Sequence, residues 1–362
     1  MFNSGRRVIL KGFRRDFSEA MSSTPKAIPI PRLSSSLILI DNQNRVLMVE
    51  RNPKSKSFAG AYVRVFPGGV YDNRQDSSNE LTAIRETFEE TGILLATPNL
   101  PFNHFPPVKQ LEAARRDIHA QRISFTQYLK DNNLSPNVGA LLPFTQWITP
   151  STAPRRFHAY FFVAFLSTSE ALSDESSMDT LQQLPTPDGG IEVISVRFIK
   201  PQDAISEFMA DKIFLMPPQF YLLNTLASLL QNDSNSREQR ETIQRLGHGS
   251  FGKRIFNPQP LPQKDSHGRI TLTYEGDETR GGPVGARHRS IVKQGKGDNA
   301  EISSLKFEGY TDTKIFDWDL FGKELVGHQQ RGYRGCRLSV NLPGASKRDR
   351  NRSTQITALF QV

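Results

Sequence analysis

One stretch of this chain, residues 63–93, combines a strand, two adjacent glycines and an acidic helix that ends at another glycine. Alternating valines at its start predict a strand that ends at Pro67, and Gly68 and Gly69 allow a tight turn close to a ligand. Gly92 is a natural end for the helix. Strand, turn and capped helix form one organised unit, which constrains the fold more than any other segment.

The predicted helix gathers three carboxylates on one face. Residues three and four apart are neighbours on a helix, so Glu86 lies beside both Glu89 and Glu90. Like charges this close repel one another, and the cluster favours a bound cation. Without the surrounding motif, the same three glutamates would equally fit an ordinary acidic helix face exposed to solvent. Oxygen ligands without Cys or His favour Mg²⁺ or Mn²⁺ over zinc. Arg85, four residues before Glu89, is placed to orient that carboxylate.

The pattern from Gly69 to Ile93 resembles the Nudix box, the loop–helix–loop of hydrolases that cleave a diphosphate linked to another group. The longer string, residues 66–72 followed by residues 83–95, resembles more specifically the Nudix motif 19 branch, the acyl-coenzyme A diphosphatases, and their fungal relatives. The resemblance covers roughly residues 34–232. It implies an α/β/α sandwich with a mixed sheet, Mg²⁺ or Mn²⁺ bound by the three glutamates, and a catalytic role for them and for Arg85.

The box departs from the usual pattern at one acidic position. In the usual box a Glu follows the first glycine by six positions and precedes the Arg by eight, and these counts reach Gln75 and Ser77 here. The loop is longer by two residues. The acids that would replace the missing carboxylate are Asp72, Asp76 and Glu80.

The resemblance implies hydrolysis of coenzyme A or acyl-coenzyme A to 3′,5′-ADP and a 4′-phosphopantetheine product. Metal ions would neutralise the phosphate oxygens and lower the pKa of a bound water. Two alternatives remain open. One is a Nudix diphosphatase for another substrate, such as a nucleoside-diphosphate sugar, a dinucleotide or an RNA cap. The other is a Nudix-shaped binding module without catalysis, because one box carboxylate is missing.

Several residues outside the helix are candidates for catalysis or for binding the substrate. Glu192 follows an Asp-Gly-Gly turn and is our candidate for a general base outside the box. Arg51 is the candidate for binding phosphate, because arginine offers two donors to it, with Lys54 and Lys56 in the same basic loop. Gly68 and Gly69 would let the backbone approach the substrate. A second basic turn carries Arg155 and Arg156.

The sequence divides into three regions: a basic segment at residues 1–33, the part that resembles Nudix hydrolases at 34–232 and a basic, Gly-rich tail at 233–362. Within the domain we expect a hairpin around residues 41–44 and a helical insert after the box helix. Further strands and helices are expected at 139–147, 159–165, 191–199, 201–209 and 217–230.

The tail carries most of the formal charge of +9, and its apolar residues are sparse, so we expect it to be largely disordered. A short alternating run at residues 268–274 predicts one added strand. Arginines clustered after residue 331 would attract RNA or an anionic membrane by charge alone, but a solvated tail is the simpler interpretation, and nucleic-acid binding is not expected.

The N-terminal 15 residues are basic and free of acids, with apolar residues at helical spacing, which is typical of mitochondrial presequences. Mitochondrial targeting is therefore expected, with a cytoplasmic or peroxisomal location as the alternative. Cys336 is the only cysteine, so intrachain disulfides are excluded. No apolar run has the length of a membrane span, and the expected partner is a small diphosphate. Nothing in the sequence indicates the oligomeric state.

Overall fold

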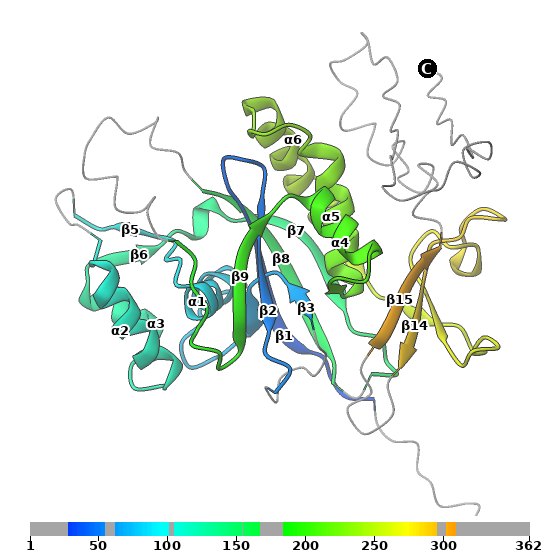
Figure 1. The fold of residues 1–362 in the computed structure, drawn as a ribbon, viewed down its shortest axis with the longest axis horizontal. Helices are drawn as coiled ribbons and strands as arrows, with labels where there is room; N and C mark the ends of the chain where they lie inside the picture. Colours follow the sequence, from blue (N-terminus) through cyan, green and yellow to red (C-terminus); the bar gives the residue numbers. More distant parts are fainter. Residues whose placement is uncertain are drawn as a thin grey trace, which may run out of the picture. The chain divides into compact units, whose positions relative to one another are not determined.

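The computed structural model describes residues 28–54, 62–100, 105–153, 155–166 and 184–294, and the backbone of residues 302–308. The chain divides into two units, 1–316 and 317–362, and every described residue belongs to the first. The centre of this unit is a mixed nine-stranded sheet with helices on both sides (Figure 1). In the described part of the chain, no helix is long and apolar enough to span a membrane.

The main sheet is assembled from strands that are distant in sequence. They are β1 (Arg32–Ile40), β2 (Val46–Arg51), β3 (Val63–Val65), β4 (Gly68–Val70), β7 (Leu142–Ile148), β8 (Phe157–Phe165), β9 (Val193–Ile199), β10 (Phe214–Leu215) and β11 (Ile255–Phe256). Their order is β10-β3-β2-β1-β8-β7-β11, with β4 paired to β1 and β9 paired to β2. The central pair, β1 and β8, is parallel and runs in register from Arg32 opposite Phe157 to Ile40 opposite Phe165.

Helices cover both faces of this sheet. They are α1 (Asn79–Thr91), α2 (Val108–His119), α3 (Phe125–Asp131), α4 (Pro201–Met209), α5 (Pro217–Leu229) and α6 (Arg237–His248). Helices α1, α2 and α3 lie on one side of the sheet, and α4, α5 and α6 lie on the other (Figure 1). A small pair of strands, β5 (Ala96–Pro98) and β6 (Leu134–Pro136), joins the helical insert. The predicted α/β/α sandwich with a mixed sheet and a helical insert is confirmed.

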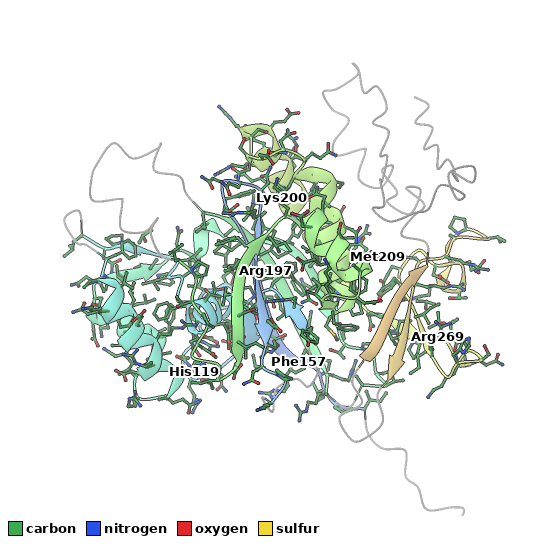
Figure 2. All side chains as sticks on the ribbon, viewed as in Figure 1. His119, Phe157, Arg197, Lys200, Met209 and Arg269 are labelled. Carbon is green, nitrogen blue, oxygen red and sulfur yellow. The ribbon has the colours of Figure 1, made fainter. Side chains whose placement is uncertain are left out.

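Strand β1 is buried on both faces, as the middle of a three-layer fold requires. Leu37 and Leu39 belong to the core shared with α1, α2 and α3. The alternate residues, Ile38 and Ile40, point to the opposite face and are also fully buried. Side chains fill the space between the sheet and both helical layers (Figure 2).

Helix α1 ends at Gly92, as predicted, and begins after Ser78. The side chain of Ser78 accepts a hydrogen bond from the backbone N–H of Leu81, and Gly92 ends the helix in the left-handed conformation at φ 78°. The hairpin around residues 41–44 is also present, because the Asp41 carboxylate accepts the backbone N–H groups of Gln43 and Arg45. The insert forms α2 and α3 where the apolar spacing predicts them.

The expected glycine turn is wrong. Gly68 and Gly69 form β4, which pairs antiparallel with Ser35 and Ser36 of β1. The absence of side chains at these two glycines lets the β4 backbone lie close to β1 and to Glu86, and it does not serve a turn. A Cβ atom on Gly69 would lie 2.3 Å from Cδ of Glu86, and one on Gly68 would lie 2.3 Å from the carbonyl oxygen of Ser35.

The expected disorder after residue 232 is wrong for residues 233–294, and the predicted domain end falls inside the folded unit. This segment contributes α6 and β11, and it begins a second sheet with the order β12-β13-β14-β15. Those strands are β12 (Gln259–Pro260), β13 (Ile270–Thr273), β14 (Arg289–Gln294) and β15 (Ile302–Glu308). The strand expected within 268–274 is confirmed. The presequence at residues 1–15, Lys56, Cys336 and the arginines after residue 331 lie outside the described residues.

Candidate active site

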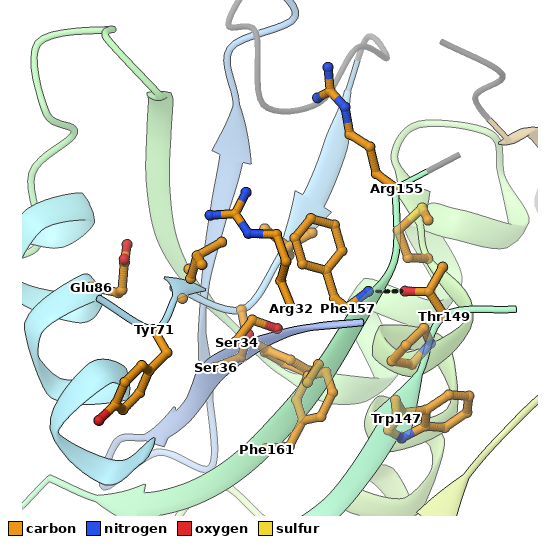
Figure 3. Close-up of a pocket in the computed structure, with 18 of the residues that line it drawn as sticks. Arg32, Ser34, Ser36, Tyr71, Glu86, Trp147, Thr149, Arg155, Phe157 and Phe161 are labelled. Carbon is orange, nitrogen blue, oxygen red and sulfur yellow. Dashed lines mark hydrogen bonds between the residues drawn. The ribbon is translucent and has the colours of Figure 1, made fainter. Parts of the chain in front are cut away.

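The three box glutamates line a single cavity of about 920 Å³ that extends over the end of the sheet. Glu86 and Tyr71 lie at one side of it, and Trp147 and Thr149 lie at the other side (Figure 3). Arg32 lies between these two sides. The cavity therefore has an acidic side on α1 and β4 and an aromatic side at β7 and β8, and its volume is in the range of small-molecule sites.

Arg85 is held in place by a buried carboxylate from the loop before α1. Its Nε and Nη2 donate to Oδ1 and Oδ2 of Asp76, each at 2.8 Å. Asp76 also accepts the backbone N–H of Asp72 and the hydroxyl of Thr82. Of the three acids that the sequence left open, Asp76 is the one beside the box arginine. The carboxylate of Asp72 instead binds Arg74 and Gln75, and Glu80 lies in the first turn of α1.

Arg85 in turn orients two of the three box glutamates. Its Nη1 donates to Oε1 of Glu86 at 2.9 Å and to Oε1 of Glu89 at 3.0 Å. Glu86 and Glu89 each keep a side-chain exposure of 14% toward the cavity. The predicted pairing of Arg85 with Glu89 is confirmed, and the same guanidinium reaches Glu86.

Glu90, the third box glutamate, is buried behind the other two. Its Oε2 accepts the backbone N–H of Gly68 at 2.9 Å, and its Oε1 has no hydrogen-bond partner among the described residues. Arg51 approaches that oxygen with Nη1 at 3.5 Å and donates from Nη2 to Glu192 at 3.1 Å. Arg51 therefore bridges the box helix and the loop before β9, which places Glu192 at the cavity.

The donor set fits a hard divalent cation. The carboxylates of Asp76, Glu86, Glu89 and Glu90 outnumber the guanidinium groups of Arg51 and Arg85, so the cluster keeps an excess of negative charge. The Oε1 of Glu90 is buried and accepts no hydrogen bond among the described residues, with Arg51 at 3.5 Å as its ion-pair partner, so it could serve as a metal ligand. Within the described ranges, no three acidic, His or Cys side chains already enclose a metal position.

Burial and nearby negative charges make Glu86 and Glu90 difficult to charge without a cation. Burial, with the neighbouring charges of Glu89 and Glu90, raises the pKa of Glu86 well above its usual range, although Arg85 opposes this effect. Burial also raises the pKa of Glu90 to about 7, against the opposing effects of Arg51 and the Gly68 N–H. A bound cation would favour the charged forms of both groups.

The helical insert reaches the site through two residues on one face of α2. Arg115 donates from Nε to the carbonyl oxygen of Glu89 at the end of α1, at 2.7 Å. His119 extends from α2 to Asp188, with 3.3 Å between Nε2 and Oδ2. Asp188 also accepts four backbone N–H groups of the loop that carries Glu192. The insert thus supports the box helix and the loop before β9 together.

The His119–Asp188 pair predicts a pH-dependent stability. The hydrogen bond to Asp188 raises the pKa of His119 to about 9, from an ordinary value of about 6.5. Because the folded pKa is the higher one, the pair stabilises the fold fully below about pH 6.5 and loses this effect as pH rises through about 9. We expect the free energy of unfolding in urea to be higher for the wild type than for His119→Gln at low pH. This difference should shrink as the pH rises from about 6.5 through about 9. A constant difference would contradict the assignment.

The remaining predicted residues divide into two groups. Arg155 lines the same cavity as the glutamates, which the sequence left open. Lys54 is exposed and is not among the described residues that line the cavity, so its predicted role stays a prediction. Arg32 and His119 were missed, since no local motif marks them, and the turn at Asp188 was identified without the contacts that its carboxylate makes. Only the parallel pairing of β1 with β8 brings Arg32 beside Phe157.

Comparisons with known proteins identify a domain within the chain. Residues 76–226 match the family model of the NUDT19 Nudix domain. The acyl-coenzyme A diphosphatase NUDT19 of Xenopus laevis is 30% identical over 190 residues, which cover 49% of this chain and 44% of that protein. A Caenorhabditis elegans protein, whose name assigns it to the nudix hydrolases, is 28% identical over 252 residues, or 68% of this chain and 73% of that protein.

The match to the first of these relatives spans less than half of that protein. Among solved structures, a NUDIX hydrolase from Alicyclobacillus acidocaldarius is 19% identical, with a TM-score of 0.45 over 56% of this chain and 93% of that one. The family match, the two relatives and the intact three-glutamate core of α1 agree with one another. Residues 76–226 of this chain are therefore similar to the Nudix domain of the NUDT19 branch.

Proposed function

We propose that this protein is a metal-dependent diphosphatase that hydrolyses coenzyme A or acyl-coenzyme A to 3′,5′-ADP and a 4′-phosphopantetheine product. The observation that carries the proposal is the buried Oε1 of Glu90, which accepts no hydrogen bond among the described residues, beside two further glutamates on the wall of the 920 Å³ cavity. The match of residues 76–226 to the NUDT19 Nudix domain supports the choice of substrate, because similar proteins are named acyl-coenzyme A diphosphatases.

Glu86, Glu89 and Glu90 would hold the Mg²⁺ or Mn²⁺ ions. When bound, such ions neutralise phosphate oxygens and lower the pKa of a coordinated water. The chain itself positions these ligands, since Arg85 fixes Glu86 and Glu89, and the Gly68 N–H fixes Glu90. Asp76 anchors Arg85 and is therefore our choice for the acid that completes the box.

One proton must leave the attacking water as its oxygen bonds to phosphorus and the bridging P–O bond breaks. Glu192 is our candidate for the acceptor of that proton, because its side chain lines the cavity with 35% exposure and is oriented by Arg51 at 3.1 Å. Arg51 also contacts Glu90, so it links the proposed base to a proposed metal ligand. We assign Arg51 this orienting role in addition to its predicted contact with phosphate.

Coenzyme A carries a phosphate on its ribose besides the diphosphate, so its site needs cations away from the glutamates. Arg32 and Arg155 line the same cavity, and both lie beyond Glu86 in the direction of Trp147 (Figure 3). Arginine suits phosphate because its planar guanidinium offers paired donors. These two residues are our candidates for the ribose phosphate.

A substrate panel tests the proposal. Purified protein with Mg²⁺ or Mn²⁺ is incubated with coenzyme A, octanoyl-coenzyme A, a nucleoside-diphosphate sugar, a dinucleotide and capped RNA, and the products are separated by chromatography. We expect 3′,5′-ADP from the coenzyme A substrates and no turnover after chelation of the metal. Rapid turnover of another substrate without coenzyme A turnover would refute the proposed substrate, and binding without turnover of any compound would favour a non-catalytic module.

A further inference from the structure

Glu192, the proposed proton acceptor, is held at three points by residues outside the box helix. Its backbone N–H donates to Oδ2 of Asp188 at 2.8 Å, and its carbonyl oxygen accepts the backbone N–H of Asn52 at 2.6 Å. Its carboxylate accepts a hydrogen bond from Nη2 of Arg51 at 3.1 Å. Arg51 ends β2 and Asn52 follows it, whereas Asp188 lies in the same loop as Glu192. The position of Glu192 therefore also depends on what fixes this loop.

The loop before β9 folds around the side chain of Asp188, which is 1% exposed. Oδ1 of Asp188 accepts the backbone N–H groups of Gly190, Ile191 and Val193 at 3.0, 2.9 and 3.2 Å. Gly190 adopts the left-handed conformation with φ 83°, which lets the backbone turn back onto the carboxylate. The Asp188 carboxylate therefore sets where the backbone of Glu192 lies.

His119 fixes Asp188 from outside this loop. Its Nε2 lies 3.3 Å from Oδ2, the oxygen that also accepts the Glu192 N–H. In the described part of the chain, no other side chain beyond the loop hydrogen-bonds the Asp188 carboxylate. Four residues earlier on α2, Arg115 donates to the backbone carbonyl oxygen of Glu89 at 2.7 Å. Helix α2 is thus fixed against the box helix, and His119 connects this fixed helix to Asp188.

We propose that His119 is a positioning residue for the hydrolysis, which acts through Asp188 to hold the Glu192 carboxylate within reach of the attacking water. The inference rests on the proposed function, and in particular on Glu192 as the proton acceptor. A general base works only within hydrogen-bond reach of its proton, and a displacement of about 1 Å can cost a factor of about 10² in rate. His119 itself lines the cavity, but its Nε2 is engaged by Asp188, so we assign it no contact with the substrate.

A double-mutant cycle on the full chain, with coenzyme A and Mg²⁺, tests this role. His119→Ala removes the hydrogen bond to Asp188 and should lower kcat by about tenfold with KM within about twofold, because a displaced base slows proton transfer without weakening binding. Glu192→Gln removes the base itself and should lower kcat by about 10²-fold. In the Glu192→Gln protein, His119→Ala should change kcat by less than about twofold, because no base remains to be positioned.

Two further variants serve as controls. His119→Gln keeps an N–H donor at the same number of bonds from the backbone as Nε2, and it should recover most of the wild-type kcat. His248→Ala makes the same change as His119→Ala at an exposed residue in the last turn of α6, and it should leave kcat and KM at the wild-type level. An unfolded fraction lowers kcat by a similar factor with or without Glu192, so a role in stability alone gives additive losses.

The outcomes separate this inference from the proposed function. A loss of kcat in His119→Ala that disappears in the Glu192→Gln protein supports the positioning role. Equal losses with and without Glu192, or a loss that appears in KM alone, overturn it while the diphosphatase function stands. Wild-type kcat in Glu192→Gln overturns it as well, because Glu192 is then not the proton acceptor. If the wild type hydrolyses a different compound of the substrate panel, the cycle uses that compound, and if it hydrolyses none, both proposals fail.

Discussion

Replacing Glu90 with Gln is expected to lower kcat for diphosphate hydrolysis by about 10³-fold. A catalytic metal contributes several kcal/mol to the transition state, and about 1.4 kcal/mol corresponds to a factor of ten in rate. The amide oxygen of Gln can still accept the Gly68 N–H, so the fold should survive the change. The uncharged side chain also avoids the cost of a buried carboxylate without its cation. Steady-state kinetics and a Mn²⁺ titration by electron paramagnetic resonance measure both effects.

Glu112→Gln is the matched control for this substitution. It makes the same chemical change at an exposed residue of α2, and it should leave kcat and Mn²⁺ affinity at the wild-type level. Thermal unfolding of both variants verifies that the fold is intact. Undiminished turnover and Mn²⁺ affinity in Glu90→Gln would show that this residue is not a metal ligand and would remove the main support for the catalytic proposal.

Replacing Asp76 with Ala is expected to destabilise the protein by about 3–5 kcal/mol, because it leaves the buried guanidinium of Arg85 without its two-point partner. The side chains of Asp76 and Arg85 are 0% and 5% exposed, so water cannot substitute for the lost carboxylate. Without Asp76, Arg85 would no longer be held where it donates to Glu86 and Glu89. The folded fraction of Asp76→Ala should therefore turn over substrate more slowly than the wild type. Urea denaturation followed by circular dichroism gives the free energy of unfolding.

Asp72→Ala provides the contrast within the same loop. Asp72 pairs with Arg74, whose side chain is 71% exposed, and an ion pair of this kind contributes about 0–1 kcal/mol. A small loss for Asp72→Ala beside a large loss for Asp76→Ala supports the assignment of Asp76 as the anchor of the box arginine. Similar losses in both variants would refute it.

The parts of the site that the sequence predicted correctly are those that depend on short-range geometry. Arg85 and Glu89 are four residues apart and meet on α1, and the helix ends at Gly92 as predicted. The two glycines were interpreted incorrectly because their prediction also used short-range geometry alone. A glycine pair predicts a turn locally, whereas here β1 and Glu86 approach the backbone so closely that no side chain fits.

The segment after residue 232 shows the complementary failure. Its high charge and sparse apolar residues predicted disorder, because composition measures how much apolar surface a segment can bury by itself. In the structure, α6 and β11 contact β7, and Trp147 of β7 packs on Phe256 and near Tyr274. The apolar residues of this segment are therefore buried against side chains of the preceding domain. The composition of a segment does not include the apolar surface that a different part of the chain contributes to the shared core.

By itself, the sequence determined that α1 carries Glu86, Glu89 and Glu90 on one face, because helical spacing is set by the backbone alone. Only the tertiary structure decided which groups meet these carboxylates. Arg51 and Glu192 are separated by 141 residues, yet they lie 3.1 Å apart, since β2 and β9 pair in the sheet. Contacts of this range depend on how the strands assemble, and no spacing along the chain encodes them.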